Sequence, residues 1–224
     1  LQERIRGNWL AMSIIAFSQG VPFFHAGDEV LRSKSLDRDS YNSGDWFNRL
    51  DFTYETNNIG VGLPGAAKNE SKWDMMRPLL ANPDLKPSKE QIMATVEHMK
   101  AILSIRMSTP LFRLQSGEEI QDRVQFYNTG LEQVPGVIVM EIQDLEGARQ
   151  LDKNFKRVIV VVNSTPEEYC EESGEFKAAC ENSALALHPI HVTKTYDDVV
   201  RTAKASEGTV KVPAYTTAVF VEPW

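Results

Sequence analysis

The first seventeen residues carry the pattern of an amphipathic helix. Apolar side chains recur at spacings of four, three and four residues, at Ile5, Trp9, Met12 and Ala16. Side chains so spaced lie on one face of an α-helix. Gln19-Gly20 then interrupts the pattern, and the apolar residues 21–25 predict a short buried strand of a parallel sheet. Helix, glycine and strand together predict an αβ unit.

Residues 26–87 contain no long periodic segment and are rich in Gly, Asn, Asp, Ser and Pro. Loops of such length are either functional or disordered. Aromatic residues recur throughout this stretch and argue against disorder: Tyr41, Trp46, Phe47, Phe52, Tyr54 and Trp73. We therefore predict an ordered functional loop.

A second helix is predicted over residues 88–107. Ser88 and Gln91 have the spacing of a capping box. An apolar stripe follows at helical spacing, formed by Ile92, Val96, Met99 and Leu103. Pro110 lies just beyond the predicted end of the helix.

The remainder of the chain is predicted to be an antiparallel β-sandwich. Runs rich in β-forming residues occur at 123–127, 136–142, 157–163, 185–192, 209–212 and 216–221. Turn residues separate them at 128–130, 146–147, 164–168 and 207–208. The Glu-rich stretch 167–181 is interpreted as a solvated surface insertion. A domain boundary near Thr109-Pro110 divides the chain into residues 1–109 and 110–224.

Composition narrows the class of protein. With 224 residues, 42% of them hydrophobic, the chain can build a sizeable core in one or two domains. A net charge of −7 disfavours nucleic acid as a partner. The longest apolar run, residues 9–17, is shorter than the roughly 20 residues that span a bilayer, so we expect no membrane segment. Cys170 and Cys180 are either free thiols or one local bridge.

Residues 20–48 read GVPFFHAGDEVLRSKSLDRDSYNSGDWFN, in which a predicted strand leads into the polar loop. This stretch resembles the eighth barrel strand and following loop of pullulanase-type starch debranching enzymes, in the α-amylase superfamily. The resemblance extends to residues 57–62, 108–114 and 216–224. Residues 134–140 and 220–224 are more similar to plant and green-algal limit dextrinases than to secreted bacterial pullulanases. The chain begins with Leu1, within a helical pattern, so we expect a piece of a longer enzyme.

The resemblance implies a fold and an activity. Residues 1–109 would be the C-terminal remnant of a (β/α)8 barrel, comprising its last strand, long loop and last helix, and residues 110–224 an antiparallel β-sandwich. The parent enzyme would cleave α-1,6 linkages in pullulan, amylopectin and limit dextrins. Its partners would be a branched α-glucan and the missing N-terminal part of the same enzyme. A plastid location is implied, with secretion or a bacterial cytoplasm as alternatives. No cofactor is expected, although the family leaves calcium open for the parent.

The family's catalytic carboxylates lie on the fourth, fifth and seventh barrel strands, so the resemblance places them all upstream and this piece should be inactive alone. Retaining hydrolysis needs two carboxyl groups about 5 to 5.5 Å apart. Asp28 and Glu29, as neighbours on a strand, would point to opposite faces. The acids of the loop have no spacing that fixes a distance. We therefore expect no catalytic residue here.

Sugar binding is the role expected of the loop, because sugars offer apolar faces to aromatic rings and hydroxyl groups to polar side chains. The candidate substrate-binding residues are Asp37, Arg38, Tyr41, Asp45, Trp46 and Asn48. A plainer alternative is that Trp46 and Phe47 only anchor the loop. His25, Glu29 and Arg32 are interpreted as structural residues near the site, with Glu29 and Arg32 as an ion pair.

Two other functions stay open. The chain could be a carbohydrate-binding module that grips starch with its sandwich, or part of an isoamylase-like debranching enzyme; residues 32–48 favour the pullulanase type. The sandwich aromatics are interpreted as mostly core: Phe126, Tyr127, Phe155, Phe176, Tyr196, Tyr215 and Phe220. His98 is expected at the surface or at an interface, and His188 and His191 are weak evidence for a metal. A barrel remnant should expose Ile5, Trp9, Met12 and residues 21–24.

Overall fold

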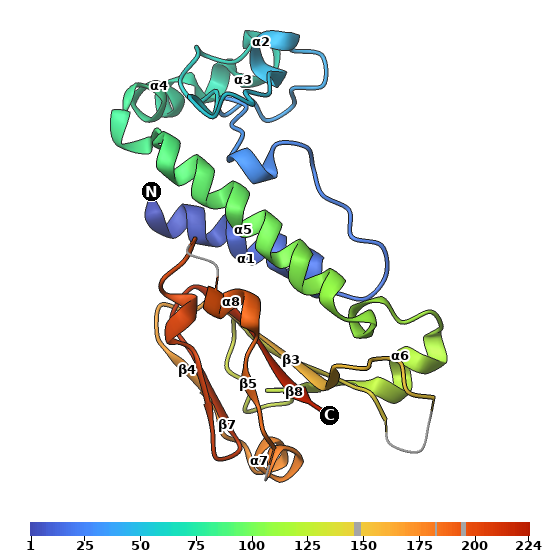
Figure 1. The fold of residues 1–224 in the computed structure, drawn as a ribbon. Helices are drawn as coiled ribbons and strands as arrows, with labels where there is room; N and C mark the ends of the chain where they lie inside the picture. Colours follow the sequence, from blue (N-terminus) through green and yellow to red (C-terminus); the bar gives the residue numbers. More distant parts are fainter. Residues whose placement is uncertain (146–148, 182, 194–195) are drawn as a thin grey trace. The chain divides into compact units, whose positions relative to one another are not determined.

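The structure is a computed structural model that describes residues 1–145, 149–181, 183–193 and 196–224 (Figure 1). The turn predicted at residues 146–147 lies outside the described residues. The chain forms two compact units. The first unit comprises Leu1–Asn8 and Phe24–Met99, and the second comprises Trp9–Phe23 and Lys100–Trp224.

Both predicted helices are present. Helix α1 spans Gln2–Phe17 and helix α5 spans Lys89–Ser108. The capping box forms as expected: the Ser88 N–H donates to Gln91 Oε1 at 2.9 Å, and the Gln91 N–H donates to Ser88 Oγ at 3.3 Å. His98, expected at the surface or at an interface, is buried, so it lies on a packed face of α5 rather than at the surface.

The first unit is built from short helical turns in the order η1, α2, α3, η2, α4 and η3. Their bounds are Asp28–Val30, Asp45–Asn48, Ala66–Asn69, Glu70–Lys72, Trp73–Ala81 and Pro83–Leu85. A small apolar cluster joins η1 to α5 through Val30, Ile92 and Val96, with Leu31 and Tyr54 packed against it. This cluster gives the loop-rich unit a core of its own.

The strand predicted at residues 21–25 is not formed. These residues are irregular, and the side chains of Val21 and Phe23 are 90% and 87% exposed. An extended segment becomes a strand only when a neighbouring backbone pairs with it. In the described part of the chain no strand does so. The prediction that residues 21–24 would be exposed is thus met at Val21 and Phe23.

The second unit contains two antiparallel sheets, which confirms the predicted antiparallel class. The larger has the strand order β1-β2-β3-β8-β5, and the smaller has the order β4-β7-β6. The strands of the larger sheet are β1 Val124–Tyr127, β2 Val137–Gln143, β3 Phe155–Asn163, β8 Thr216–Pro223 and β5 Ala186–Leu187. Those of the smaller sheet are β4 Tyr169–Glu171, β7 Thr209–Val212 and β6 Lys204–Ser206. Every described pair of strands is antiparallel.

Short helices connect the strands of this unit. They are η4 Pro110–Arg113, α6 Gly117–Arg123, α7 Gly174–Cys180, α8 Pro189–Thr193 and η5 Val200–Thr202. The strand predicted at residues 185–192 is wrong beyond Leu187. Pro189 supplies no backbone N–H to a ladder and suits the first position of a helix, and α8 begins there.

The Glu-rich stretch 167–181 is not the solvated insertion that was predicted. It forms β4 and α7, and Phe176 and Cys180 are fully buried in the core between the two sheets. The Tyr127 and Phe176 rings meet in an edge-to-face arrangement with a centroid distance of 5.0 Å. Most acidic residues of the stretch are exposed, but Glu171 is buried and accepts a hydrogen bond from the Tyr169 hydroxyl at 2.5 Å. The high average charge of the segment therefore concealed its buried side chains.

The larger sheet is buried on both faces. Ile159, Val161, Ala218 and Phe220 face the smaller sheet, and their neighbours along the strands, Val158, Val160, Val219 and Val221, are buried on the opposite face. The later turns of α1, from Trp9, and of α5, from Lys100, belong to the second unit. They are its long helical segments available to cover that opposite face of the larger sheet (Figure 1).

Several contacts hold α1 in place within this unit. Phe17 packs on Phe112 with ring centroids 5.3 Å apart. The Arg106 guanidinium donates to the carbonyl oxygens of Ala16 and Ser18, both at 2.7 Å, and so satisfies acceptors at the end of the helix. Trp9 packs edge-on against Tyr196, with ring centroids 6.0 Å apart.

The prediction that Ile5, Trp9 and Met12 would be exposed is wrong, since all three side chains are buried. The interpretation of the seven sandwich aromatics as core holds for Tyr127, Phe176 and Phe220. Phe126 departs from it, because this side chain on the edge strand β1 is 51% exposed.

A buried ionic cluster lies on the inner face of the larger sheet. Arg157 Nε is 2.9 Å from Glu141 Oε1 and 3.3 Å from Glu222 Oε2. The Tyr127 hydroxyl donates to Glu141 Oε2 at 2.5 Å, and the Arg157 guanidinium also donates to the Ala179 carbonyl at 2.7 Å. Burial, and then the bond to Glu141, raises the pKa of Tyr127. Glu141 therefore accepts the buried Tyr127 hydroxyl and pairs ionically with the buried Arg157.

Replacing Glu141 with Ala should lower the free energy of unfolding by about 3 kcal/mol, because Arg157 and Tyr127 would stay buried without this acceptor. Urea unfolding followed by circular dichroism would measure the loss. Glu132→Ala, at an exposed position, is the matched control and should change little. A loss below about 1 kcal/mol for Glu141→Ala would contradict this account.

His188 is buried with both ring nitrogens engaged. The Ile190 N–H donates to Nδ1 at 3.2 Å, so the ring proton lies on Nε2, which is 3.0 Å from Ser108 Oγ. Ser108 Oγ donates in turn to the Ile105 carbonyl at 2.7 Å. Burial lowers the pKa of His188 to about 4. The folded protein thus holds this imidazole neutral.

Acidification should destabilise the protein through His188. Below pH about 6.5 the unfolded chain binds a proton at this residue, whereas the folded protein does not bind it until pH about 4. The unfolding constant should therefore rise by up to about ten-fold per pH unit across this window. His188→Gln should show a smaller pH slope in chemical denaturation, and His25→Gln, at an exposed site, should retain the original slope. Equal slopes in all three proteins would refute the assignment.

Candidate functional site

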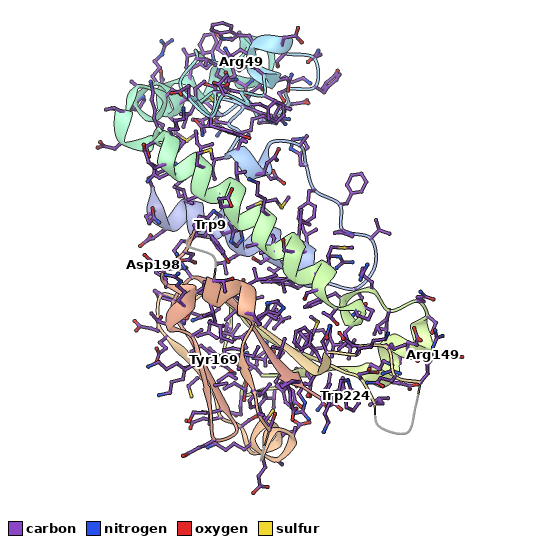
Figure 2. All side chains as sticks on the ribbon, viewed as in Figure 1. Trp9, Arg49, Arg149, Tyr169, Asp198 and Trp224 are labelled. Atoms are coloured by element: carbon purple, nitrogen blue, oxygen red, sulfur yellow. The ribbon has the colours of Figure 1, made fainter. Side chains whose placement is uncertain are left out.

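The loop between η1 and α4 is held together mainly by side chains that bond to backbone groups (Figure 2, around Arg49). Such bonds replace the ladders of regular secondary structure. The N–H groups of Thr53 and Thr56 donate to the Asp51 carboxylate at 2.9 and 3.2 Å. Asn57 Nδ2 donates to the Leu31 carbonyl at 2.8 Å. The loop is ordered, as its aromatic content predicted.

Asp37 is a buried organiser of the loop. Its carboxylate accepts hydrogen bonds from Ser43 Oγ at 2.5 Å, from Asn69 Nδ2 at 3.0 Å and from the Asp39 N–H at 3.2 Å. Burial alone would raise the pKa of Asp37, but these bonds, with Lys68 nearby, hold it below the ordinary value. The group is therefore a permanent acceptor already occupied by protein donors.

Asn48 plays a similar part. Its Nδ2 donates to the carbonyl oxygens of Ser40 at 2.7 Å and Gly44 at 3.1 Å, and its Oδ1 accepts from Ser40 Oγ at 3.1 Å. Three bonds from one amide thus close the turn that precedes α2. Asn58 then fixes α2 from the other side, because its Nδ2 donates to the Trp46 carbonyl at 2.9 Å.

Trp46 and Tyr41 present open aromatic surfaces. Trp46 is 62% exposed, while its Nε1 donates to the Val61 carbonyl at 3.1 Å, so the ring is fixed in orientation and still accessible. Tyr41 is 79% exposed, and Lys68 Nζ lies 4.6 Å from its ring centroid. The Trp46 side chain therefore anchors the loop through its Nε1 and still exposes its ring to solvent.

Charged side chains surround these rings. Arg38 is exposed, and Asp45 lies with Trp46, Asn48 and Arg49 along a shallow surface pocket. A second pocket of about 270 Å³ has polar and charged walls from the loop and from α3. Its polar and charged lining residues are Asp37, Asp39, Asn42, Ser43, Lys68 and Asn69. Lys68 and Asp39 form an ion pair across it.

The six candidate substrate-binding residues thus separate into two groups. Arg38, Tyr41, Asp45 and Trp46 are exposed and free to meet a ligand, whereas Asp37 and Asn48 are committed to the loop itself. Sequence reasoning missed other residues that hold the loop together, chiefly Ser43, Lys68 and Asn69. The local pattern of residues does not show which distant groups these side chains contact.

The residues predicted to be structural near the site have other partners than expected. Glu29 does not pair with Arg32: its Oε2 accepts from the Gly27 N–H at 2.9 Å. Arg32 donates to the Asn48 carbonyl at 3.2 Å and lies 3.2 Å from the His25 ring. Residues 28–30 form the turn η1 and no strand continues through them, so the side chains of Glu29 and Arg32 point to different partners. Arg32 instead connects the start of the loop to α2.

Among the residues that the structure describes, no group of three or more His, Cys, Asp or Glu side chains is placed to hold a metal ion. Among the described helices, none has the length and apolar character to cross a bilayer.

Comparison with known proteins gives a consistent result. Residues 54–223 match the family model described as alpha-1,6-glucosidases, pullulanase-type, C-terminal. The chain is 49% identical to chloroplastic pullulanase 1 of Arabidopsis thaliana over 99% of its own length and 23% of that protein. The crystal structure of PulA from Klebsiella oxytoca has a TM-score of 0.89 and 32% identity, over 100% of this chain and 21% of that one.

A maltotriose complex of PulA from Klebsiella pneumoniae is equally similar, with a TM-score of 0.89 and 31% identity, over 100% of this chain and 23% of that one. The fold and the sequence agreement place this chain among the C-terminal domains that this family model describes. The chain belongs to the pullulanase-type α-1,6-glucosidase family. It spans about a quarter or less of the length of these relatives.

Replacing Asn48 with Ala should loosen the turn before α2, because the Ser40 and Gly44 carbonyls lose their shared donor. Trypsin cleavage after Arg49 should become several-fold faster while the melting of the second unit, followed by circular dichroism, changes little. Asn42→Ala, an exposed position in the same loop, is the matched control. Equal cleavage rates in the two variants would show that Asn48 does not hold the turn.

Proposed function

We propose that this chain is the C-terminal part of an enzyme that cleaves α-1,6-glucosidic branch linkages in pullulan and limit dextrins. The observation that carries the proposal is the family match over residues 54–223, together with 49% identity to a plant pullulanase. On the same basis the enzyme would act in starch metabolism. The chloroplastic relative favours a plastid location for it.

We further propose that residues 1–109 complete a (β/α)8 barrel and that residues 110–224 form the sandwich domain beside it. The exposed apolar side chains of Val21 and Phe23 support this division. They lie on an extended segment that would gain both backbone partners and apolar contacts from neighbouring strands of a barrel. α1 and α5 would then be helices of the barrel's outer ring.

The loop is proposed to bind glucan. Trp46 and Tyr41 would stack on the apolar faces of glucose rings, and Arg38 and Asp45 would bond to hydroxyl groups. Asp37 and Asn48 would contribute by shaping the loop, since their polar atoms are already engaged. The maltotriose complex of the Klebsiella pneumoniae relative supports an α-glucan as the ligand class.

Catalytic groups are proposed to come from outside these residues. Asp37 and Asp51 both have lowered pKa values: burial at Asp37 is outweighed by its three hydrogen bonds, and Asp51 is bonded chiefly by the Thr53 side chain and N–H. A carboxyl with a lowered pKa is a poor proton donor at neutral pH. Neither residue therefore suits the acid/base role.

Trp46→Ala should weaken binding of maltotriose and of branched glucan by about ten-fold, because a stacking surface is lost. Isothermal titration calorimetry would measure the affinities. Trp46→Phe, which keeps a ring but loses the bond to Val61, should retain most of the binding. Phe126→Ala tests the carbohydrate-binding-module alternative, since Phe126 is an exposed aromatic residue on a strand of the sandwich.

The outcomes separate the hypotheses. Loss of binding in Phe126→Ala but not in Trp46→Ala would move the binding site to the sandwich. The chain should release no reducing sugar from pullulan even when circular dichroism shows that it is folded. Hydrolysis by the purified chain would mean that its own carboxylates are catalytic, against the proposal.

A further inference from the structure

Asn69 connects two parts of the loop that lie far apart in sequence. It is the last residue of α3, with only 2% of its surface exposed. Its Nδ2 donates to Asp37 Oδ1 at 3.0 Å and to the Gly65 carbonyl at 3.1 Å. Its Oδ1 accepts from the Arg38 N–H at 3.4 Å. One side-chain amide therefore acts as donor and acceptor toward the start of the binding loop.

The effect of this contact extends along the loop through Asp37. The same carboxylate holds the Asp39 N–H and Ser43 Oγ, so its position sets the course of the chain toward α2. Lys68, next to Asn69, pairs with Asp39 and lies over the Tyr41 ring. α3 thus contacts this part of the loop at several successive points, and the bond from Asn69 to Asp37 is buried.

We propose that Asn69 is a positioning residue, which holds Asp37 and thereby fixes the loop conformation in which Arg38, Tyr41 and Trp46 meet a glucan. The inference rests on the proposed glucan-binding function. Asn69 is too deeply buried to contact the sugar itself. Its role requires an amide, because the site presents two acceptors, Asp37 and the Gly65 carbonyl, and one donor, the Arg38 N–H.

The substitution Asn69→Asp tests this requirement directly. At pH 8 it would set a second carboxylate against that of Asp37, and the two like charges would repel. At pH 5 the pair can share one proton, which restores a hydrogen bond between them. The other charged groups facing the pair are Lys68 and Asp39, bound to each other, and the exposed Arg38. The wild type should show no such recovery.

Maltotriose binding measured by calorimetry at pH 8 and pH 5 is the first readout. Asn69→Asp should bind about ten-fold or more weakly than wild type at pH 8 and come close to the wild-type affinity at pH 5. Asn82→Asp is the matched control, because Asn82 caps η3 by accepting from the Asp84 N–H, a place where Asp serves equally well. It should bind like wild type at both pH values.

Trypsin cleavage after Arg38 at pH 8 is the second readout and needs no ligand. Faster cleavage in Asn69→Asp than in Asn82→Asp supports the inference, and equal cleavage with unchanged affinity overturns it. Weakened binding that persists unchanged at pH 5 also overturns it, since the carboxylate pair would not be the cause. If wild type binds no maltotriose, the proposed function fails, and the cleavage rates alone decide whether Asn69 holds the loop.

Discussion

The five-stranded sheet is apolar on both faces, and the second unit is organised by the need to cover both of them. Alternate residues of β3 and β8 point to opposite sides, yet Ile159 and Val160, or Val219 and Phe220, are equally buried. The smaller sheet and α7 cover one face. The later parts of α1 and α5, from Trp9 and from Lys100 onward, belong to this unit and are its long helical segments available for the other face.

Burial on this scale leaves polar groups that must find partners inside the protein. The carboxylate of Glu141 accepts from Tyr127 and pairs with Arg157, and the ring of His188 is fixed between the Ile190 N–H and Ser108. The buried His188 imidazole is held neutral, because burial lowers its pKa to about 4. It therefore makes the stability of this unit depend on pH, which apolar packing alone would not do.

The proposed binding loop follows a different principle. It has little regular secondary structure, so its shape comes from side chains such as Asp37, Asn48 and Asn69 that bond to backbone or to one another. The rings that would meet a sugar, those of Trp46 and Tyr41, are exposed, and hydrogen bonds to Val61 and Asn58 hold Trp46 in place. Such a division allows exposed rings to be held in fixed positions without a sheet or long helix beneath them.

The sequence by itself determined the two long helices, the antiparallel strands of the larger sheet and the family, because periodicity, capping residues and motifs are local. It also identified the loop and its exposed rings. Tertiary structure alone decided that residues 21–25 form no strand, that Phe176 and Cys180 are core within an acidic segment, and that Asp37 is an internal anchor rather than a free acceptor. Each of these depends on which distant backbone or side chain comes close, and such long-range pairing leaves no mark in the local pattern of residues.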